Sequence, residues 1–202
     1  MSLQFLITSL IVVIAPGAGV LITLAAGLAH GRRASLVAAF GCTLGILPHM
    51  LAAITGLAAL LHASSIAFQT LKYVGAAYLL YMAWMALKDQ GALHVHADAA
   101  PRSAWEIIRH AVLVNAFNPK LSIFFLAFLP QFIGADAADP TVVMLEQSAV
   151  FMAMTLGVFA IYGVCAATLR DRVLSRPAVL KWMRGGFAAV FLGLGLKLAS
   201  GN

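Results

Sequence analysis

The most regular feature of the chain is a series of long apolar runs separated by short polar stretches. The runs cover approximately 3–28, 34–61, 66–87, 110–133, 142–169 and 184–199. A helix of about 20 apolar residues crosses the hydrocarbon core of a bilayer, so each run is long enough, or nearly so, for one crossing. The pattern predicts an all-α polytopic membrane protein with six transmembrane helices.

Two of these runs carry a proline inside the predicted helix. The first run contains Ala15-Pro16-Gly17, and the fourth contains Asn118-Pro119-Lys120. Proline has no N–H and its ring clashes with the carbonyl four residues earlier, so each helix is expected to kink or break there. At Pro119 this frees the carbonyl of Asn115. Because lipid satisfies no backbone polar group, both breaks are expected to face protein or water.

The predicted helices fall into two sets of three within a single transmembrane domain. Residues 1–88 form the first repeat and residues 110–202 the second, with a cytoplasmic linker at 89–109. The third helix of each set begins alike, with Leu71-Lys72-Tyr73 and Leu180-Lys181-Trp182. Three is an odd number, so the second set enters the membrane from the opposite side. Paired broken helices in inverted repeats indicate a transport site near the bilayer midplane.

Polar residues inside the fourth run gather around its proline. Asn115, Asn118 and Ser122 are spaced i, i+3 and i+7, which places them along one helical face. Lys120 is costly in hydrocarbon, at about 2.5–3.5 kcal/mol near the helix centre. It therefore either lines a cavity or reaches the cytoplasmic interface, and the sequence leaves both open.

The second run has small residues and a histidine on one face. Gly41, Gly45 and His49 follow one another at intervals of four, and Gly41 and Gly45 let another backbone come close. Pro48 predicts a kink beside His49. Histidine titrates near neutral pH, so His49 is either a proton-coupling group or a neutral residue donating one hydrogen bond. The candidate substrate-binding residues are Pro16, Gly17, Thr43, Gly45, His49, Asn115, Asn118, Pro119, Lys120 and Thr155.

Composition and charge support a membrane location and set the topology. The chain is 62% hydrophobic and 10% charged, with a mean hydropathy of +0.96, which excludes an ordinary soluble domain. The net charge of +6 forms no single patch and does not indicate nucleic acid. Ten of the thirteen lysines and arginines lie in the first, third and fifth loops. These loops are therefore predicted to be cytoplasmic and both termini external.

Catalysis and metal binding find little support in the sequence. A membrane enzyme needs a clustered nucleophile, base or metal set inside the membrane, and the sequence offers His49 there without such a cluster. His94 and His96 lie in the linker without further ligands, which is weak support for a metal site. The sequence predicts no catalytic residue, no metal and no cofactor. A non-transporting scaffold or assembly factor and a membrane enzyme remain as alternatives.

Several motifs together resemble the lysine and homoserine/threonine exporter family (LysE/RhtB) of bacterial inner membranes. They are His30-Gly31-Arg32-Arg33, LKYVGAAYL at 71–79, Asn118-Pro119-Lys120, and Phe128-Leu129-Pro130-Gln131-Phe132. The resemblance implies a multi-pass inner-membrane protein, surrounded by lipid, that exports amino acids or their derivatives from the cytoplasm. It also implies protons as the coupling ion, and it leaves a homodimer open.

The chain departs from that family in its lack of acidic residues within the membrane. Ile46 stands where many members carry an acid, and the stretch 150–169 has no carboxylate. A cationic substrate side chain would need such a partner, so a neutral amino acid is expected. Lys120 is then predicted to meet the substrate carboxylate. The substrate ammonium is left with carbonyls freed by the three prolines that break helices, aided by Thr43 and Thr155.

Overall fold

Among the residues that the structure describes, every regular element is a helix, as predicted. The computed structural model describes residues 1–15, 17–63, 65–88, 103–134, 138–168 and 177–200. The α-helices are α1 (Leu3–Ile14), α2 (Ala18–Leu44), α3 (Leu47–Ala63), α4 (Ser65–Lys88), α5 (Ala104–Ala116), α6 (Pro119–Ile123), α7 (Pro140–Thr168) and α9 (Pro177–Ser200). A π-helical turn η1 (Phe124–Phe128) and a 3₁₀ turn η2 (Leu129–Phe132) continue α6.

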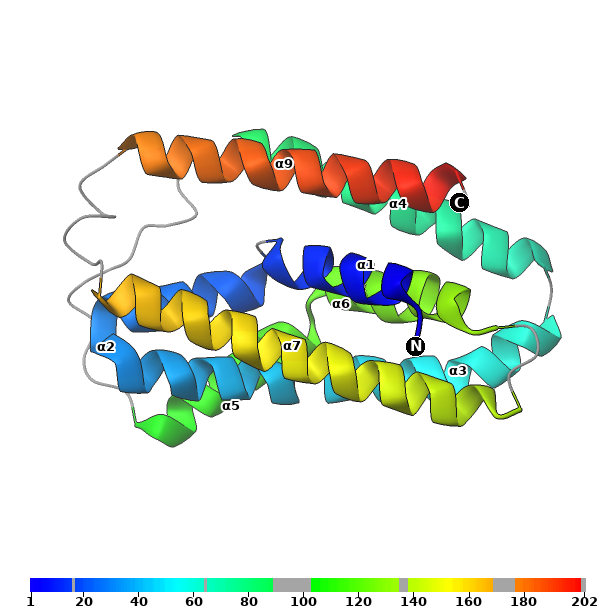
Figure 1. Ribbon diagram of the computed structural model, residues 1–202, viewed down its shortest axis with the longest axis horizontal. Coiled ribbons are helices and arrows are strands. Elements are labelled where there is room, and N and C mark those ends of the chain that lie inside the picture. The colour runs from blue at the N-terminus through cyan, green and yellow to red at the C-terminus, as the bar shows by residue number, and fades with distance from the viewer. Residues whose placement is uncertain (16, 64, 89–102, 135–137, 169–176, 201–202) are drawn as a thin grey trace.

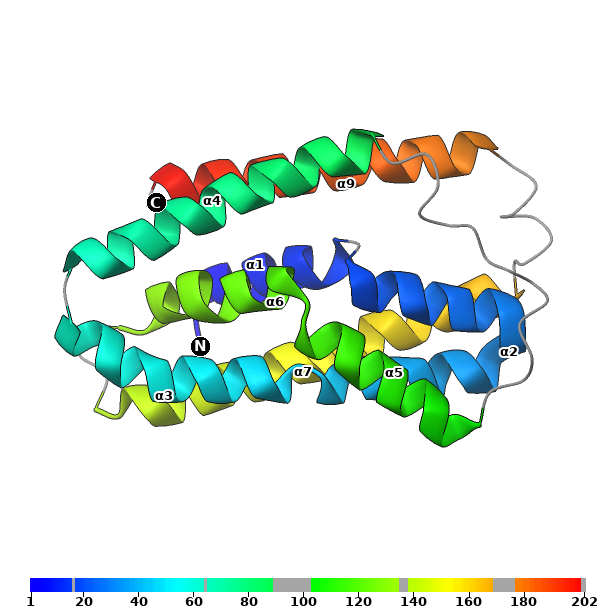
Figure 2. The ribbon, with the colours of Figure 1, turned by 180° about the vertical axis from the view of Figure 1, so that it is seen from behind.

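The long helix α2 reverses direction at one glycine. Gly31 has φ 80° and ψ −170°, in the region that residues with a side chain rarely adopt. Figures 1 and 2 show the two arms of α2 running in opposite directions along the long axis. The chain continues in the same manner, with α3 extending the second arm, and α4, α5 with α6, α7 and α9 following in alternating directions.

Length and composition identify candidate membrane crossings within the described residues. Ala18–Gly56 and Pro140–Thr168 are apolar enough over 39 and 29 residues, and the pair Ala104–Ala116 and Pro119–Phe132, bent by 49°, qualifies as a third. The first stretch is about twice as long as one crossing needs, and Gly31 divides it. The bend of the third confirms the break predicted at Pro119.

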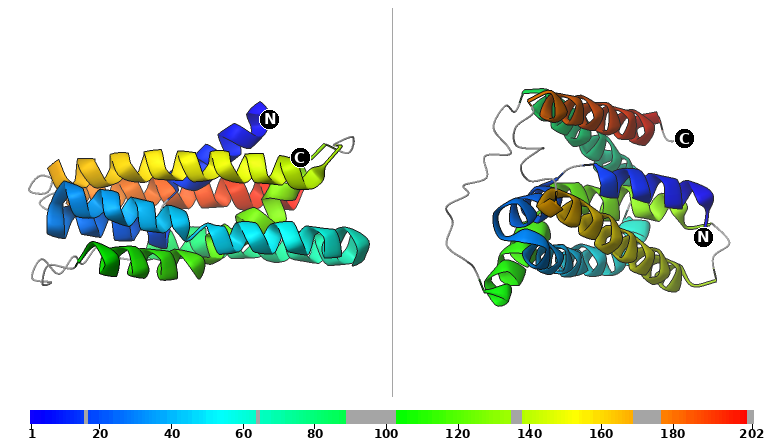
Figure 3. Two further views of the ribbon diagram at one scale, coloured as in Figure 1. Left: turned by 90° about the horizontal axis from the view of Figure 1, so that it is seen from below. Right: turned by 60° about the vertical axis from the view of Figure 1, so that its left-hand side comes forward.

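The helices pack in layers that leave α1 and α6 in the middle. The most extensive contacts are those of α2 with α7, α4 with α9, and α2 with α5. In Figures 1 and 3, the α4–α9 pair lies on one side of α1 and α6, and α2, α5 and α7 lie on the other. Small residues bring α2 and α7 together, since a Cβ on Gly27 would lie 2.6 Å from the Gly163 carbonyl oxygen.

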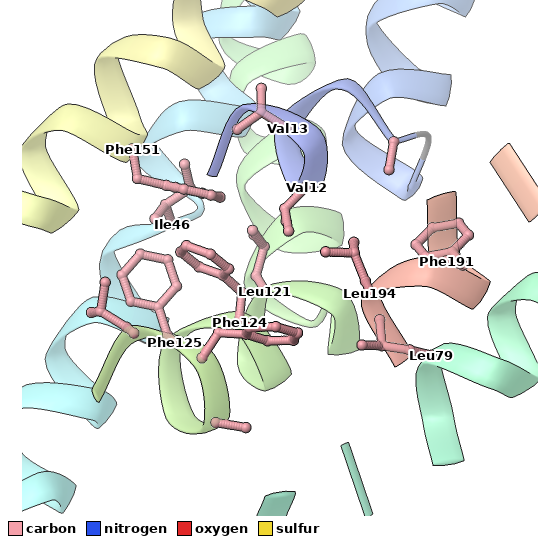
Figure 4. Close-up of a cluster of buried hydrophobic side chains, with 14 of the residues drawn as sticks. Val12, Val13, Ile46, Leu79, Leu121, Phe124, Phe125, Phe151, Phe191 and Leu194 are labelled. Carbon is pink, nitrogen blue, oxygen red and sulfur yellow. The ribbon is translucent and has the colours of Figure 1, made fainter. Parts of the chain in front are cut away.

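An aromatic cluster forms the core beside α6. The rings of Phe124 and Phe151 stack with centroids 4.3 Å apart, and Phe125 meets Phe151 edge-on at 5.4 Å. Figure 4 shows these rings with Val12 and Ile46 packed near them. Phe124 follows Lys120 by one helical turn. Apolar side chains thus surround this region, and the polar partners of Lys120 must come from backbone at helix ends.

Two helix boundaries differ from those expected. Helix α5 begins at Ala104, inside the segment 89–109 predicted as linker, because Ser103 and Glu106 form a capping box. The kink expected at Pro48 lies slightly earlier: α2 ends at Leu44 and α3 starts at Leu47. Pro48 then occupies the first turn of α3, where a missing N–H costs nothing. His94 and His96 lie outside the described residues.

Candidate functional site

The first helix break presents carbonyl groups to a lysine from the other half of the chain. Helix α1 ends at Ile14, and α2 starts at Ala18. The Val12 carbonyl would normally accept the N–H of residue 16, but that residue is proline and has none. Lys120 Nζ donates instead, to Val12 O at 3.1 Å and to Ala15 O at 2.7 Å. The negative end of the α1 dipole also favours a cation here. Pro16 itself lies outside the described residues.

Lys120 is buried rather than extended toward the interface. Its exposed fraction is 4%, and its side chain crosses from α6 to α1. Of the two alternatives left open by the sequence, the structure therefore shows a lysine turned into the protein. Gly17 makes room for it, since a Cβ there would lie 3.2 Å from both Cε and Nζ of Lys120.

The second helix break presents its freed carbonyl to a histidine. Pro119 has no N–H for the Asn115 carbonyl, which accepts from the Asn118 backbone N–H at 3.1 Å and from His49 Nε2 at 3.0 Å. Asn118 also caps the start of α6, because its Oδ1 accepts from the Lys120 backbone N–H at 3.1 Å. The carbonyl predicted to be freed at Asn115 thus has a buried side-chain donor.

The hydrogen bonds of His49 define which ring nitrogen carries the proton. A carbonyl only accepts, so Nε2 must be protonated to donate to Asn115 O. Nδ1 lies 3.2 Å from Ser122 Oγ. The hydroxyl can donate to a neutral ring or accept from a protonated one. Both hydrogen bonds are therefore compatible with either form of the ring.

Asn115 joins the two breaks into one buried network. Its Nδ2 donates to Cys42 O at 2.6 Å, and its Oδ1 accepts from Asn118 Nδ2 at 3.0 Å. Only 2% of Asn115 is exposed. Bonded groups thus extend from the end of α1, through Lys120 and Asn118, to α2 and His49 on α3. Two members of the polar stripe in the fourth run, Asn115 and Ser122, are hydrogen-bonded to His49.

Gly41 and Gly45 of the second run let the backbone of α5 come close, as expected. A Cβ on Gly45 would lie 2.8 Å from Asn115 Cβ, and a Cβ on Gly41 would lie 2.9 Å from Ala111 Cβ. Both neighbours belong to α5. Gly41, Gly45 and His49 therefore all meet the same helix, even though the break after Leu44 interrupts the face they were predicted to share.

Two predicted residues take no part in the network. The hydroxyl of Thr43 donates to Ala39 O at 2.9 Å, and that of Thr155 donates to Phe151 O at 2.8 Å. Each bond lies within the residue's own helix. Within the described part of the chain, both hydroxyls are thereby satisfied without contacting Lys120 or His49.

Sequence reasoning missed the residues that contribute only backbone. The carbonyls of Val12, Ala15 and Cys42 hold Lys120 and Asn115. Val12 had a signal, because it stands four residues before a proline. Ala15 and Cys42 had none, since any residue carries a carbonyl. Within the described residues, no three His, Cys, Asp or Glu side chains gather as a potential metal site.

The model of the LysE type translocator family matches residues 10–202. The chain belongs to the LysE translocator family. Its relatives include an uncharacterized membrane protein of Vibrio cholerae, 33% identical over 98% of this chain and 96% of the relative. No solved structure matches this LysE-family chain.

Two other relatives have names that state a cargo. A homoserine/homoserine lactone efflux protein of Salmonella typhi is 31% identical over 97% of this chain and 94% of its own length. A leucine efflux protein of Klebsiella pneumoniae is 26% identical, covering 98% of this chain and 94% of the relative. The LysE-family relationship therefore extends over essentially the whole protein.

Proposed function

We propose that this LysE-family protein is a secondary transporter that exports neutral amino acids or close derivatives from the cytoplasm. The observation that carries the proposal is the meeting of the two broken helices in one buried network. At both breaks, the carbonyl that loses its usual helical donor to a proline accepts from a side chain of the other half of the chain, Val12 O from Lys120 and Asn115 O from His49. Polar helix ends in the interior of an apolar bundle are where transporters bind their substrates.

Charge supports a neutral substrate. Among the described residues, the buried polar side chains include Lys120 but no aspartate or glutamate, and Glu146 is exposed. A substrate carboxylate finds a cation in Lys120, whereas a second positive charge on the substrate would be buried without a partner. Efflux proteins for homoserine and leucine among the relatives are consistent with this, because neither side chain is charged.

His49 is the proposed site of proton exchange. It is buried, contacts the same asparagine network as Lys120, and retains both hydrogen bonds in either protonation state. A group that changes charge beside the substrate site couples the occupancy of the two ligands electrostatically. Protons moving inward would thus drive the substrate outward.

We propose six membrane crossings arranged as two inverted repeats in the bacterial inner membrane, with residues 1–88 and 110–202 as the repeats and both termini external. The alternating helix directions support this arrangement (Figures 1 and 2). A reporter active only outside the cytoplasm should be active when fused after Asn202 and inactive at Asp98. Activity at Asp98 would invert the proposed topology. A homodimer stays a prediction.

A growth-inhibition screen across amino acids and their analogues tests the function. Cells overproducing the protein should tolerate a toxic excess of one or more neutral compounds, because export lowers their internal concentration. Cells producing Lys120→Ala at equal abundance are the control. Protection by both proteins, or by neither under any condition, would favour the scaffold or enzyme alternative over transport.

A further inference from the structure

The end of α1 is an acceptor site whose shape suits a primary ammonium group. Val12 O and Ala15 O lie 3.1 and 2.7 Å from one nitrogen, that of Lys120. An ammonium has three N–H donors, and within the described residues Lys120 Nζ uses two. Ser9, fully buried one turn before Val12 on α1, has an Oγ without a hydrogen-bond partner. This part of α1 thus has a further buried polar group, Ser9 Oγ, that Lys120 does not bind.

A substrate ammonium has few other places to bind. Within the described residues, no buried carboxylate is available to it. The other carbonyl freed by a proline, Asn115 O, already accepts from Asn118 N and from His49. The carbonyl pair of α1 already binds an ammonium, and it lies at the negative end of a helix dipole.

Lys120 and a substrate ammonium therefore compete for the same two oxygens. Two ammonium groups at one pair of carbonyls would repel each other in a region of low dielectric constant. The flexible four-carbon stem of lysine allows its end to move while its backbone stays fixed. Phe124 and Phe125 make the core beside α6 apolar, so a displaced Lys120 ammonium finds no polar partner among these rings. Its most favourable partner is then the carboxylate of the substrate that displaced it.

We propose that Val12 O and Ala15 O form the ammonium subsite of the transporter, and that Lys120 occupies this subsite until a substrate's primary ammonium displaces it. This rests on the proposed export of neutral amino acids. After displacement, Lys120 pairs with the substrate carboxylate, so each buried charge keeps an opposite or polar partner. The ligand class is a primary alkylammonium. Quaternary ammonium ions are excluded because they have no N–H to donate.

The first test replaces the lysine by a free ion. Lys120→Ala removes Cγ, Cδ, Cε and Nζ, which together correspond to propylammonium. The purified protein is melted in propylammonium chloride and in propyltrimethylammonium chloride at equal ionic strength. Propylammonium should raise the Tm of Lys120→Ala by about 3 °C at roughly ten times its dissociation constant. Propyltrimethylammonium should not.

The matched control is Tyr162→Phe. The Tyr162 hydroxyl donates to Ile14 O at 3.1 Å, so this variant also uncaps the end of α1 but leaves Lys120 in place. In Tyr162→Phe and in the wild-type protein Lys120 already occupies the two carbonyls, so both should need a much higher propylammonium concentration for the same rise in Tm. An equal response of Lys120→Ala to both ions, or stabilisation of Tyr162→Phe at the same propylammonium concentration as Lys120→Ala, overturns the subsite.

A second test uses the wild-type protein and so does not depend on the folding of Lys120→Ala. Exchange of a labelled neutral amino acid is measured in proteoliposomes, with the pH held equal on both sides. Propylammonium should raise the apparent KM several-fold at an unchanged maximal rate, and propyltrimethylammonium should leave KM unchanged. Exchange that both ions inhibit equally, or that neither inhibits, overturns the subsite alone. If the protein exchanges no neutral amino acid at all, the proposed function itself is overturned.

Discussion

At both helix breaks a backbone carbonyl lacks its usual N–H donor, and the two breaks supply that donor from different side chains. At each, a proline leaves the carbonyl four residues earlier without its usual donor, at Val12 in the first half and at Asn115 in the second. At each, a buried side chain from the other half supplies the donor. The first break receives the ammonium of Lys120, whereas the second receives the imidazole of His49.

In the proposed function, this difference gives the two breaks separate tasks. A lysine ammonium offers three donors and a compact charge, which suits competition with another ammonium. Histidine in general can change its charge near neutral pH, and both partners of His49 can bond to either form of the ring. We therefore propose that the first break binds the substrate charge and that the second binds the coupling ion. The predictions that follow test this assignment.

Replacing Lys120 should have the largest effect. Lys120→Ala removes two hydrogen bonds from a charged donor, each worth about 1.5–3 kcal/mol. Export should fall by about 100-fold or more. Lys120→Arg should lose most of the activity, because a planar guanidinium does not fit a site shaped for an ammonium. Export rates from loaded cells, at matched protein abundance, measure both. Wild-type export by Lys120→Ala would remove the lysine from the site.

Changes at the second break should be weaker. Pro119→Ala supplies a new N–H that competes with His49 for Asn115 O, and Asn118→Ala removes the side chain between Asn115 and Lys120. Each variant should insert normally and export about tenfold more slowly, the effect of losing about 1.4 kcal/mol. Normal export by both variants at normal abundance would show that transport does not depend on Asn118 and Pro119.

His49→Gln should separate exchange from uphill transport. The glutamine amide can still donate to Asn115 O but does not titrate. Exchange of substrate at equal concentrations should stay within about threefold of wild type, because the change corresponds to less than one hydrogen bond. Accumulation driven by a pH gradient should be lost. Retained accumulation in proteoliposomes would place the proton site elsewhere.

The smallest effects are expected at the two threonines. Thr43→Ala and Thr155→Ala each remove a hydroxyl bonded within its own helix. Substrate affinity, measured as the apparent KM for exchange, should change by less than about twofold. A change of tenfold or more in either variant would bring that hydroxyl into the site, as the sequence alone suggested.

The sequence predicted the breaks at Pro16 and Pro119, and it named the carbonyl of Asn115 as freed, because these consequences follow from covalent chemistry. Pro119 lacks an N–H wherever it stands, so the consequence for Asn115 is local. Gly41 and Gly45 likewise predicted a close backbone contact, which α5 supplies. The start of α5 was missed although the pattern Ser103-x-x-Glu106 is a helix-start signal.

The partners of the freed carbonyls could not be predicted from the sequence because they depend on tertiary packing. Lys120 and Val12 are 108 residues apart. On an ideal helix Lys120 points well away from Asn118, and the sequence does not give the 49° bend between α5 and the helical segment that carries Lys120. Thr43 and Thr155 were chosen as polar residues in apolar helices. Such hydroxyls commonly bond to the carbonyl four residues earlier, as both do here.

A site with one cation of its own and, within the described residues, no buried carboxylate is expected to take a neutral amino acid. Counterflow in proteoliposomes tests it most directly, with labelled leucine, threonine and lysine offered to the wild-type protein and to Lys120→Ala. Leucine or threonine should exchange at least about tenfold faster than lysine, which corresponds to about 1.4 kcal/mol, and Lys120→Ala should exchange none of them. Efficient lysine exchange, or full activity of Lys120→Ala, would contradict it.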